Sequence, residues 1–250
     1  KQILNERLGL DPKDVKFIDG DTDRVAFGMG TNGSRSTVIG GGAAWTAADR
    51  IIEKGRKIAA HVLEASVEDV EFKAGQFSVR GTDKTLGIKE VAKSSFVLTK
   101  LPPGLEAGLF ETATYAPKSE TWPNGSHACE VEIDPGTGEV QVVGYWVVDD
   151  VGTMINPVGV KGQIHGGVAQ GLGQALMERV VYDRESGQLL TGSFMDYAMP
   201  RAADMPHIEI ENNSVPTNTN PMGAKGAGEA GTVGALPAVM NAVNHALASV

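Results

Sequence analysis

The sequence predicts an α+β fold, in which hairpins and small mixed sheets combine with a few long helices. Residues 70–80 predict a hairpin, and the alternating segment 127–134, a PGTG turn and the long apolar segment 139–150 predict two further strands. Apolar residues at helical spacing predict long helices at about residues 43–63, 160–177 and 233–248. Strands and helices do not alternate regularly, so the order favours α+β over a doubly wound parallel sheet.

Several shorter elements complete the expected fold. We expect a strand at Val15–Ile18, a short helix at about Ile88–Ala92, a hairpin across residues 178–193 and a strand at residues 207–212. Four prolines make residues 101–125 the best candidate for a linker or long loop. We therefore expect one α+β subdomain at residues 1–100, the linker, and a second subdomain at residues 126–250.

Composition narrows the class of protein. The chain has 250 residues, 22 Lys and Arg against 31 Asp and Glu, and a net charge of −9. An acidic chain without a basic stripe is a poor partner for nucleic acid or an anionic membrane. The single cysteine, Cys129, supports neither a disulfide framework nor a Cys/His zinc site. No apolar run approaches the ~20 residues of a membrane span.

Two glycine-rich loops match the pattern G-x-G-x-x-G, at Gly28–Gly33 and Gly226–Gly231. A dinucleotide site would need a strand directly before the loop and a βαβ unit around it, and neither loop has them. Both loops precede helices, whose free N–H groups favour anions. Hydroxyl groups and Arg35 favour a phosphate at residues 27–42, although a loop that only turns tightly is the alternative. The run GGVAQGLG in the middle helix favours helix packing through small residues.

Other chemically active side chains have ordinary explanations. Cys129 lies in an alternating strand and is expected to be a small core residue. His127 and His165 are expected at ordinary polar positions rather than as ligands, and the three tryptophans as packing residues. The acidic run Asp19, Asp21 and Asp23 lacks the glycine and final glutamate of an EF-hand, so we expect a solvated turn.

Five segments, taken together, resemble the large subunit of molybdenum hydroxylases, the xanthine dehydrogenase/carbon monoxide dehydrogenase family. They occur in the family's order: GMGTNGSRSTVIGGGAA, HACEVEIDPGTGEVQVVGYWVVDDVGTMINP, GVKGQIHGGVAQGLGQAL, the block around DYAMPRAADMP, and NPMGAKGAGEAG. The GSRST loop is most similar to the aerobic carbon monoxide dehydrogenase branch. The chain opens without Met inside an expected helix, so we expect a C-terminal fragment that lacks the upstream half.

The resemblance implies a molybdopterin cofactor, expected as the cytosine dinucleotide, whose dithiolene rather than protein side chains holds the molybdenum. It implies Glu229 as the catalytic base, on a glycine loop in a half-buried pocket. The cofactor-binding residues that it implies are Gly33, Ser34, Arg35, Ser36, Thr37, Gln163, Lys225, Gly226, Ala227 and Gly228. No residue is expected to bind the metal directly.

The resemblance further implies a complex with an FAD-binding subunit and a 2Fe–2S subunit, as a cytoplasmic dimer of heterotrimers. The reaction would be oxidative hydroxylation of CO, an aldehyde or an N-heterocycle with water as oxygen donor. Two other hypotheses stay open. The chain could be a cofactor-binding module without activity of its own, or a nucleotide-binding protein unrelated to molybdenum.

Overall fold

The computed structural model describes residues 1–25 and 27–248, which form two compact units. The first unit comprises residues 1–30 and 36–118, and the second comprises residues 31–35 and 119–250. The short segment 31–35 therefore groups with a part of the chain that lies far from it in sequence. No described helix is long and apolar enough to cross a membrane.

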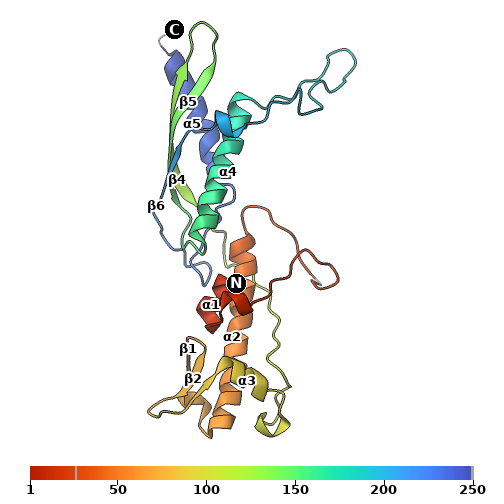
Figure 1. The fold of residues 1–250 in the computed structure, drawn as a ribbon, viewed down its shortest axis with the longest axis vertical. Coiled ribbons are helices and arrows are strands. Elements are labelled where there is room, and N and C mark those ends of the chain that lie inside the picture. The colour runs from red at the N-terminus through yellow and green to blue at the C-terminus, as the bar shows by residue number, and fades with distance from the viewer. Residues whose placement is uncertain (26, 249–250) are drawn as a thin grey trace. The chain divides into compact units, whose positions relative to one another are not determined.

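In the first unit, the long helix α2 (Ser36–Leu63) packs beside a small sheet (Figure 1). The sheet is antiparallel, with the order β1 (Val70–Lys73), β2 (Gln76–Val79) and β3 (Thr85–Gly87). The predicted hairpin at residues 70–80 is thus confirmed, and β3 extends it. The remaining elements are helices α1 (Gln2–Leu8) and α3 (Ile88–Ser94) and the 3₁₀ turns Pro12–Asp14, Val67–Asp69 and Leu98–Lys100.

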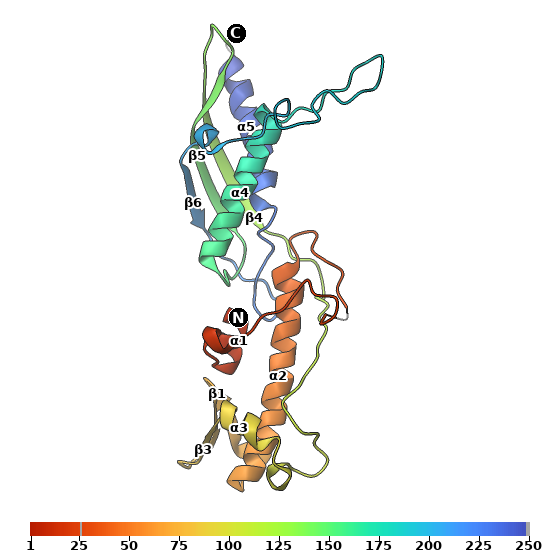
Figure 2. The same cartoon turned by 45° about the vertical axis from the view of Figure 1, so that its right-hand side comes forward.

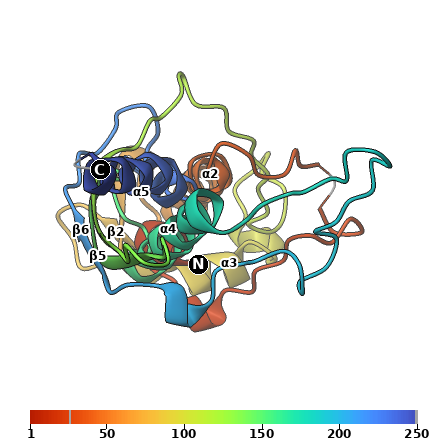
Figure 3. The same cartoon turned by 90° about the horizontal axis from the view of Figure 1, so that it is seen from above.

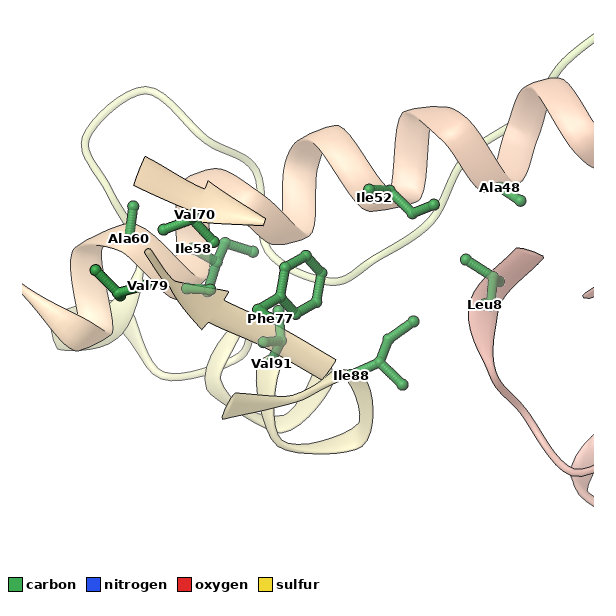
Figure 4. Packing of buried hydrophobic residues seen from close by; sticks show 11 residues of the cluster. Leu8, Ala48, Ile52, Ile58, Ala60, Val70, Phe77, Val79, Ile88 and Val91 are labelled. Atoms are coloured by element: carbon green, nitrogen blue, oxygen red, sulfur yellow. The ribbon is translucent and has the colours of Figure 1, made fainter. Parts of the chain in front are cut away.

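The core of this unit is centred on Phe77, which is fully buried between the sheet and α2 (Figure 4). Ile58 on α2 and Val91 on α3 are also fully buried in the same cluster. A Cβ atom on Gly55 would lie 2.5 Å from Cζ of Phe77. A glycine in mid-helix costs about 1 kcal/mol relative to alanine, but here only glycine leaves room for the ring.

Helix α2 begins at Ser36 rather than near Ala43, so the predicted loop at residues 27–42 is too long. The glycines at positions 40–42 are helical instead. Packing explains the difference, because Gly41 and Gly42 are buried and a Cβ atom on Gly42 would lie 2.4 Å from the Tyr115 ring. Tertiary contact here overrides the weak helix propensity of glycine.

The predicted strand at Val15–Ile18 is wrong, because these residues form no strand in the structure. Phe17 is 68% exposed, so the alternation of apolar and polar residues does not mark a buried face. A strand needs a partner for its backbone groups, and none of the described strands pairs with this segment.

The second unit places two helices on a three-stranded sheet (Figure 2). The sheet has the order β4 (Asn124–Ile133), β5 (Val140–Asp150) and β6 (Ile208–Asn212). Strands β4 and β5 are antiparallel with a bulge between Glu130 and Val131, and β6 runs parallel to β5. These strands, helix α4 (Pro157–Leu176) and helix α5 (Ala230–Leu247) confirm the predicted elements. A 3₁₀ turn, Ala202–Asp204, precedes β6.

Helices α4 and α5 lie against each other over the sheet, as the view from above also shows (Figure 3). Their contact depends on glycine. A Cβ atom on Gly167 would lie 2.8 Å from the backbone nitrogen of Thr232, and one on Gly171 would lie 2.6 Å from Cβ of Ala235. The predicted packing through small residues is therefore confirmed.

The predicted hairpin at residues 178–193 forms, but its two sides are too irregular to count as β-strands. A single bridge pairs Tyr182 with Leu189, and Leu190 N–H donates to Val181 O at 2.8 Å. Among the described residues no third strand pairs with this hairpin, so it forms only part of the ladder that its sequence pattern predicts.

The adjacent glycines Gly166 and Gly167 on α4 provide a matched test of the helix contact. A Cβ atom on Gly166 meets nothing within 4 Å, so Gly166→Ala should raise the free energy of unfolding by about 1 kcal/mol through helix propensity. Gly167→Ala should lower it by about 1–3 kcal/mol, because the α5 backbone cannot move away. Urea unfolding of the two variants checks this difference, and equal effects would contradict the packing.

Candidate active site

The second unit brings together residues from three distant segments. Ser34 Oγ donates a hydrogen bond to Glu229 Oε2 at 2.7 Å, although the two residues are 195 positions apart. Gln163, on the second turn of α4, lies on the same side of the glycine loop. The glycine-rich segments that sequence patterns singled out are thus joined at one place.

The segment around Ser34 adopts an unusual backbone conformation. Gly33 and Ser34 both have φ of 56°, and Arg35 N–H donates to Asn32 O at 3.3 Å. A left-handed residue other than glycine costs on the order of 1 kcal/mol, so this turn needs support from its surroundings. The turn directs the Ser34 side chain toward the Glu229 carboxylate.

The loop Gly226–Glu229 approaches this turn so closely that only glycine fits at position 226 and a Cβ atom at position 228 would be crowded. A Cβ atom on Gly226 would lie 2.7 Å from Ser34 Cβ and 2.9 Å from Ser34 O. A Cβ atom on Gly228 would lie 3.2 Å from Ser34 Oγ and 3.7 Å from Gln163 Oε1. These glycines therefore make the contact between Ser34 and Glu229 possible.

Glu229 occupies the N-cap position of α5, but its side chain makes no capping hydrogen bond. Its carboxylate turns to Ser34 instead, and the residue is exposed. This differs from the half-buried pocket expected for it, because no described residue of this chain covers it. A carboxylate at a helix N-terminus is stabilised by the helix dipole, which helps to hold it there.

Lys225 was expected to contact the cofactor, but its ammonium group forms an ion pair with Asp150 at the end of β5. Asp150 Oδ1 also accepts from the N–H groups of Gly152 at 2.9 Å and Val215 at 3.0 Å. Burial alone would raise the pKa of Asp150, but Lys225 and the two N–H donors outweigh it and hold the pKa below its ordinary value. Lys225 thus anchors the glycine loop to the sheet.

A second anchor, Asn220, was missed from the sequence. Its buried side chain accepts from the N–H groups of Met222 and Ala224 and donates to Ala224 O at 2.8 Å. Ala224 also forms a β-bridge with Gly152. The only signal was the segment NPMG, whose Asn-Pro pair is typical of a turn. Asp150 and Asn220 together determine where the glycine loop begins.

The other candidate residues separate into two groups. Ala227 lies half-buried in the glycine loop, whereas Ser36 and Thr37 open helix α2 in the first unit, directly after Arg35 in the chain. His127 Nδ1 lies 2.8 Å from the Tyr145 hydroxyl oxygen, beneath Gly234 of α5. His165 Nδ1 lies 2.8 Å from Lys161 O. His165 is exposed, as expected of an ordinary polar position, whereas the His127 side chain is buried and its Nε2 lies 3.4 Å from Oδ1 of the buried Asp149.

Two further expectations can be compared with the structure. Cys129 packs against the core of the second unit, and burial raises the pKa of its thiol to about 11. In the acidic run, Asp21 Oδ1 accepts from Asp23 N–H at 3.0 Å in an exposed turn. The described residues contain no cluster of three or more His, Cys, Asp or Glu that could hold a metal ion.

The comparisons with known proteins agree with this arrangement. A family model described as a molybdopterin cofactor-binding domain matches residues 1–206. This chain belongs to the molybdopterin cofactor-binding domain family. The carbon monoxide dehydrogenase large chain of Hydrogenophaga pseudoflava is 39% identical over 250 residues, covering 100% of this chain and 31% of that relative.

Solved structures show the same fold. Reconstituted CO dehydrogenase from Oligotropha carboxidovorans matches with a TM-score of 0.93 and 39% identity, over 99% of this chain and 30% of that one. Quinoline 2-oxidoreductase from Pseudomonas putida 86 matches with a TM-score of 0.91 and 41% identity, over 99% of this chain and 31% of that one. The α+β prediction is confirmed, and the chain spans about a third of the length of these relatives.

The ion pair beneath the glycine loop predicts a pH-dependent stability. Lys225→Met should lower the free energy of unfolding at neutral pH by about 3 kcal/mol, because it leaves the Asp150 charge buried without its partner. A lowered folded-state pKa contributes stability above the unfolded-state pKa and loses it as pH falls through the folded value. The difference between wild type and variant should therefore shrink below about pH 4.

Urea unfolding at a series of pH values measures this difference. Lys161→Met is the matched control, because Lys161 is exposed on α4 and its removal should change the free energy by at most about 0.5 kcal/mol. A Lys225→Met penalty that stays constant down to pH 3 would show that Asp150 is not the partner that matters.

Proposed function

We propose that this chain forms part of the large subunit of a molybdenum hydroxylase, with Glu229 as the catalytic base. The observation that carries the proposal is the hydrogen bond from Ser34 to Glu229 at the meeting point of two glycine-rich loops, in a chain of the molybdopterin-binding family. The substrate we propose is a small molecule of the CO, aldehyde or N-heterocycle class. The relatives are named for CO and for quinoline at similar identity, so identity does not select one.

The residues present suit an organic cofactor that carries phosphate. Arg35 and Gln163 offer a guanidinium and an amide as donors for phosphate and pterin oxygens. The Ser34 hydroxyl donates its proton to Glu229, so toward the cofactor it can only accept a hydrogen bond. A Cβ atom on Gly33 would meet nothing within 4 Å, so the turn faces open space. We propose that the cofactor, rather than a protein side chain, holds the metal, as the family resemblance implies. When bound, the cofactor supplies the molybdenum that oxidises the substrate.

We assign cofactor binding to three stretches of this chain. The first is Gly33, Ser34, Arg35, Ser36 and Thr37, the second is Gln163, and the third is Gly226, Ala227 and Gly228. Lys225 acts through Asp150 as a positioning residue rather than by touching the cofactor. We further propose the cytosine dinucleotide form, partner subunits with FAD and 2Fe–2S, a dimer of heterotrimers and a cytoplasmic location.

The proposed chemistry of Glu229 follows from its surroundings. The Ser34 hydroxyl donates to Oε2 and fixes the plane of the carboxylate, so Oε1 is the oxygen that accepts a proton from the attacking water. The glycines on either side of the loop let its backbone approach the cofactor. Because Glu229 is exposed within this chain, other parts of the large subunit must exclude water from it. We therefore propose that the chain alone has no turnover.

Glu229→Gln in the complete enzyme tests the base directly. The amide keeps the size and can accept from Ser34, but it cannot take a proton, so turnover should fall by ~10²–10⁴-fold. Molybdenum content and pterin fluorescence should stay near the wild-type level, because the variant leaves the binding loops intact. Glu211→Gln on β6 is the matched control for a changed charge.

Ser34→Ala tests whether the serine acts through Glu229. Losing one oriented hydrogen bond should lower turnover by about tenfold, less than the loss of the base itself. In the double variant with Glu229→Gln, the serine change should have no additional effect, because the base that the hydroxyl orients is absent. Steady-state turnover of the four proteins measures the coupling, and strictly multiplicative losses would argue that Ser34 works independently of Glu229.

A further inference from the structure

A projecting hairpin in the second unit is built for contact with something outside this chain. We call residues 179–196 the arm. It leaves the end of α4, extends away from the helices and sheet of its unit, and returns before β6 (Figures 1 and 2). Its large apolar side chains are exposed, namely Val180, Tyr182, Leu189, Leu190, Phe194 and Met195. An apolar strip of this kind on a protein surface marks an interaction site.

The arm is ordered by its own hydrogen bonds. Tyr182 and Leu189 form a β-bridge, and Val181 N–H donates to Thr191 Oγ1 at 3.0 Å. At the base, the Tyr197 hydroxyl donates to Glu178 Oε2 at 2.7 Å and joins the two ends of the arm. A segment that is already folded loses little conformational entropy on binding, which favours a docking role.

The distribution of polarity along the arm indicates how it would dock. The tip is polar: Asp183 Oδ1 accepts from Ser186 N–H and Oγ–H and from Glu185 N–H, and these bonds hold the pKa of Asp183 below its ordinary value. Near the base, Phe194 is 82% exposed and Met195 is 93% exposed. A hollow of about 400 Å³ is lined by residues 194–201. The apolar flanks and base would be covered, while the tip reaches water.

We propose that the arm docks onto the part of the large subunit that this chain does not contain. This proposal rests on the proposed function, because it takes the chain as part of a large subunit. The relatives are about three times as long, and this chain covers 31% of the carbon monoxide dehydrogenase large chain of Hydrogenophaga pseudoflava. A covalently joined partner has a high effective concentration, so it outcompetes a second copy for the same surface.

Cysteine labelling of the complete large subunit tests the docking. Met195→Cys reports on the base of the arm, and Ser186→Cys at the polar tip is the matched control. The native Cys129 is half-buried with a pKa of about 11, so it reacts slowly. We expect maleimide to label position 195 at least about 100-fold more slowly than position 186, as measured by peptide mass spectrometry.

The outcomes separate the occupants. Equal labelling of positions 195 and 186 would overturn the proposal, because the arm would then be free. Protection at position 195 that disappears on dilution of the subunit would also overturn it, since a second copy would be the occupant. Protection that persists on dilution supports the proposal. Labelling needs neither molybdenum nor turnover, so its failure is distinct from a failure of Glu229 as base.

Discussion

The candidate site depends on the close approach of the loop at Gly226 and Gly228 to the turn that carries Ser34. Any side chain at Gly226 would overlap Ser34 Cβ, so the hydrogen bond between Ser34 and Glu229 exists because these positions lack a Cβ. The strained φ of Ser34 is part of the same constraint. An unfavourable backbone conformation persists where its surroundings hold it, and here the glycine loop packs directly on it.

Two buried polar side chains, Asp150 and Asn220, hold that loop in position through hydrogen bonds. Asp150 lies at the end of β5 and binds Lys225, Gly152 and Val215, so a single carboxylate joins the sheet to two segments that follow it. Asn220 fixes the next turn through three backbone hydrogen bonds. Buried polar groups with satisfied partners specify one arrangement, because each alternative leaves a group unpaired. The position of the Glu229 carboxylate thus depends on residues outside the proposed catalytic contact.

Local patterns in the sequence predicted most of the fold. Strands β4 and β5, the hairpin of β1 and β2, and helices α4 and α5 follow from alternation or helical spacing, which are properties of the segment itself. The start of α2 could not be predicted this way, since the helical state of its glycines depends on Tyr115 far along the chain. The segment Val15–Ile18 failed for the opposite reason: its pattern was suitable, but no partner strand exists among the described residues.

The sequence likewise predicted only part of the candidate site. The family resemblance implied Ser34, Gln163 and Glu229 as site residues, but it did not imply the direct contact between Ser34 and Glu229, which joins residues 195 positions apart. For Lys225, the motif could not show which group its ammonium contacts within the chain. A lysine in a glycine loop is a natural phosphate ligand, and this one pairs with Asp150, a carboxylate that the fold buries at the end of β5.

Two exposed features of the second unit have a common physical explanation. Glu229 is an exposed carboxylate at a helix N-cap, where bulk water weakens its electrostatic interactions. The arm is an ordered hairpin whose apolar side chains are exposed, so their burial contributes no stability within this chain. Neither is favourable in a chain that acts alone. Each becomes favourable if protein outside this chain covers it, because a covered apolar flank regains hydrophobic stabilisation and a covered carboxylate is shielded from water.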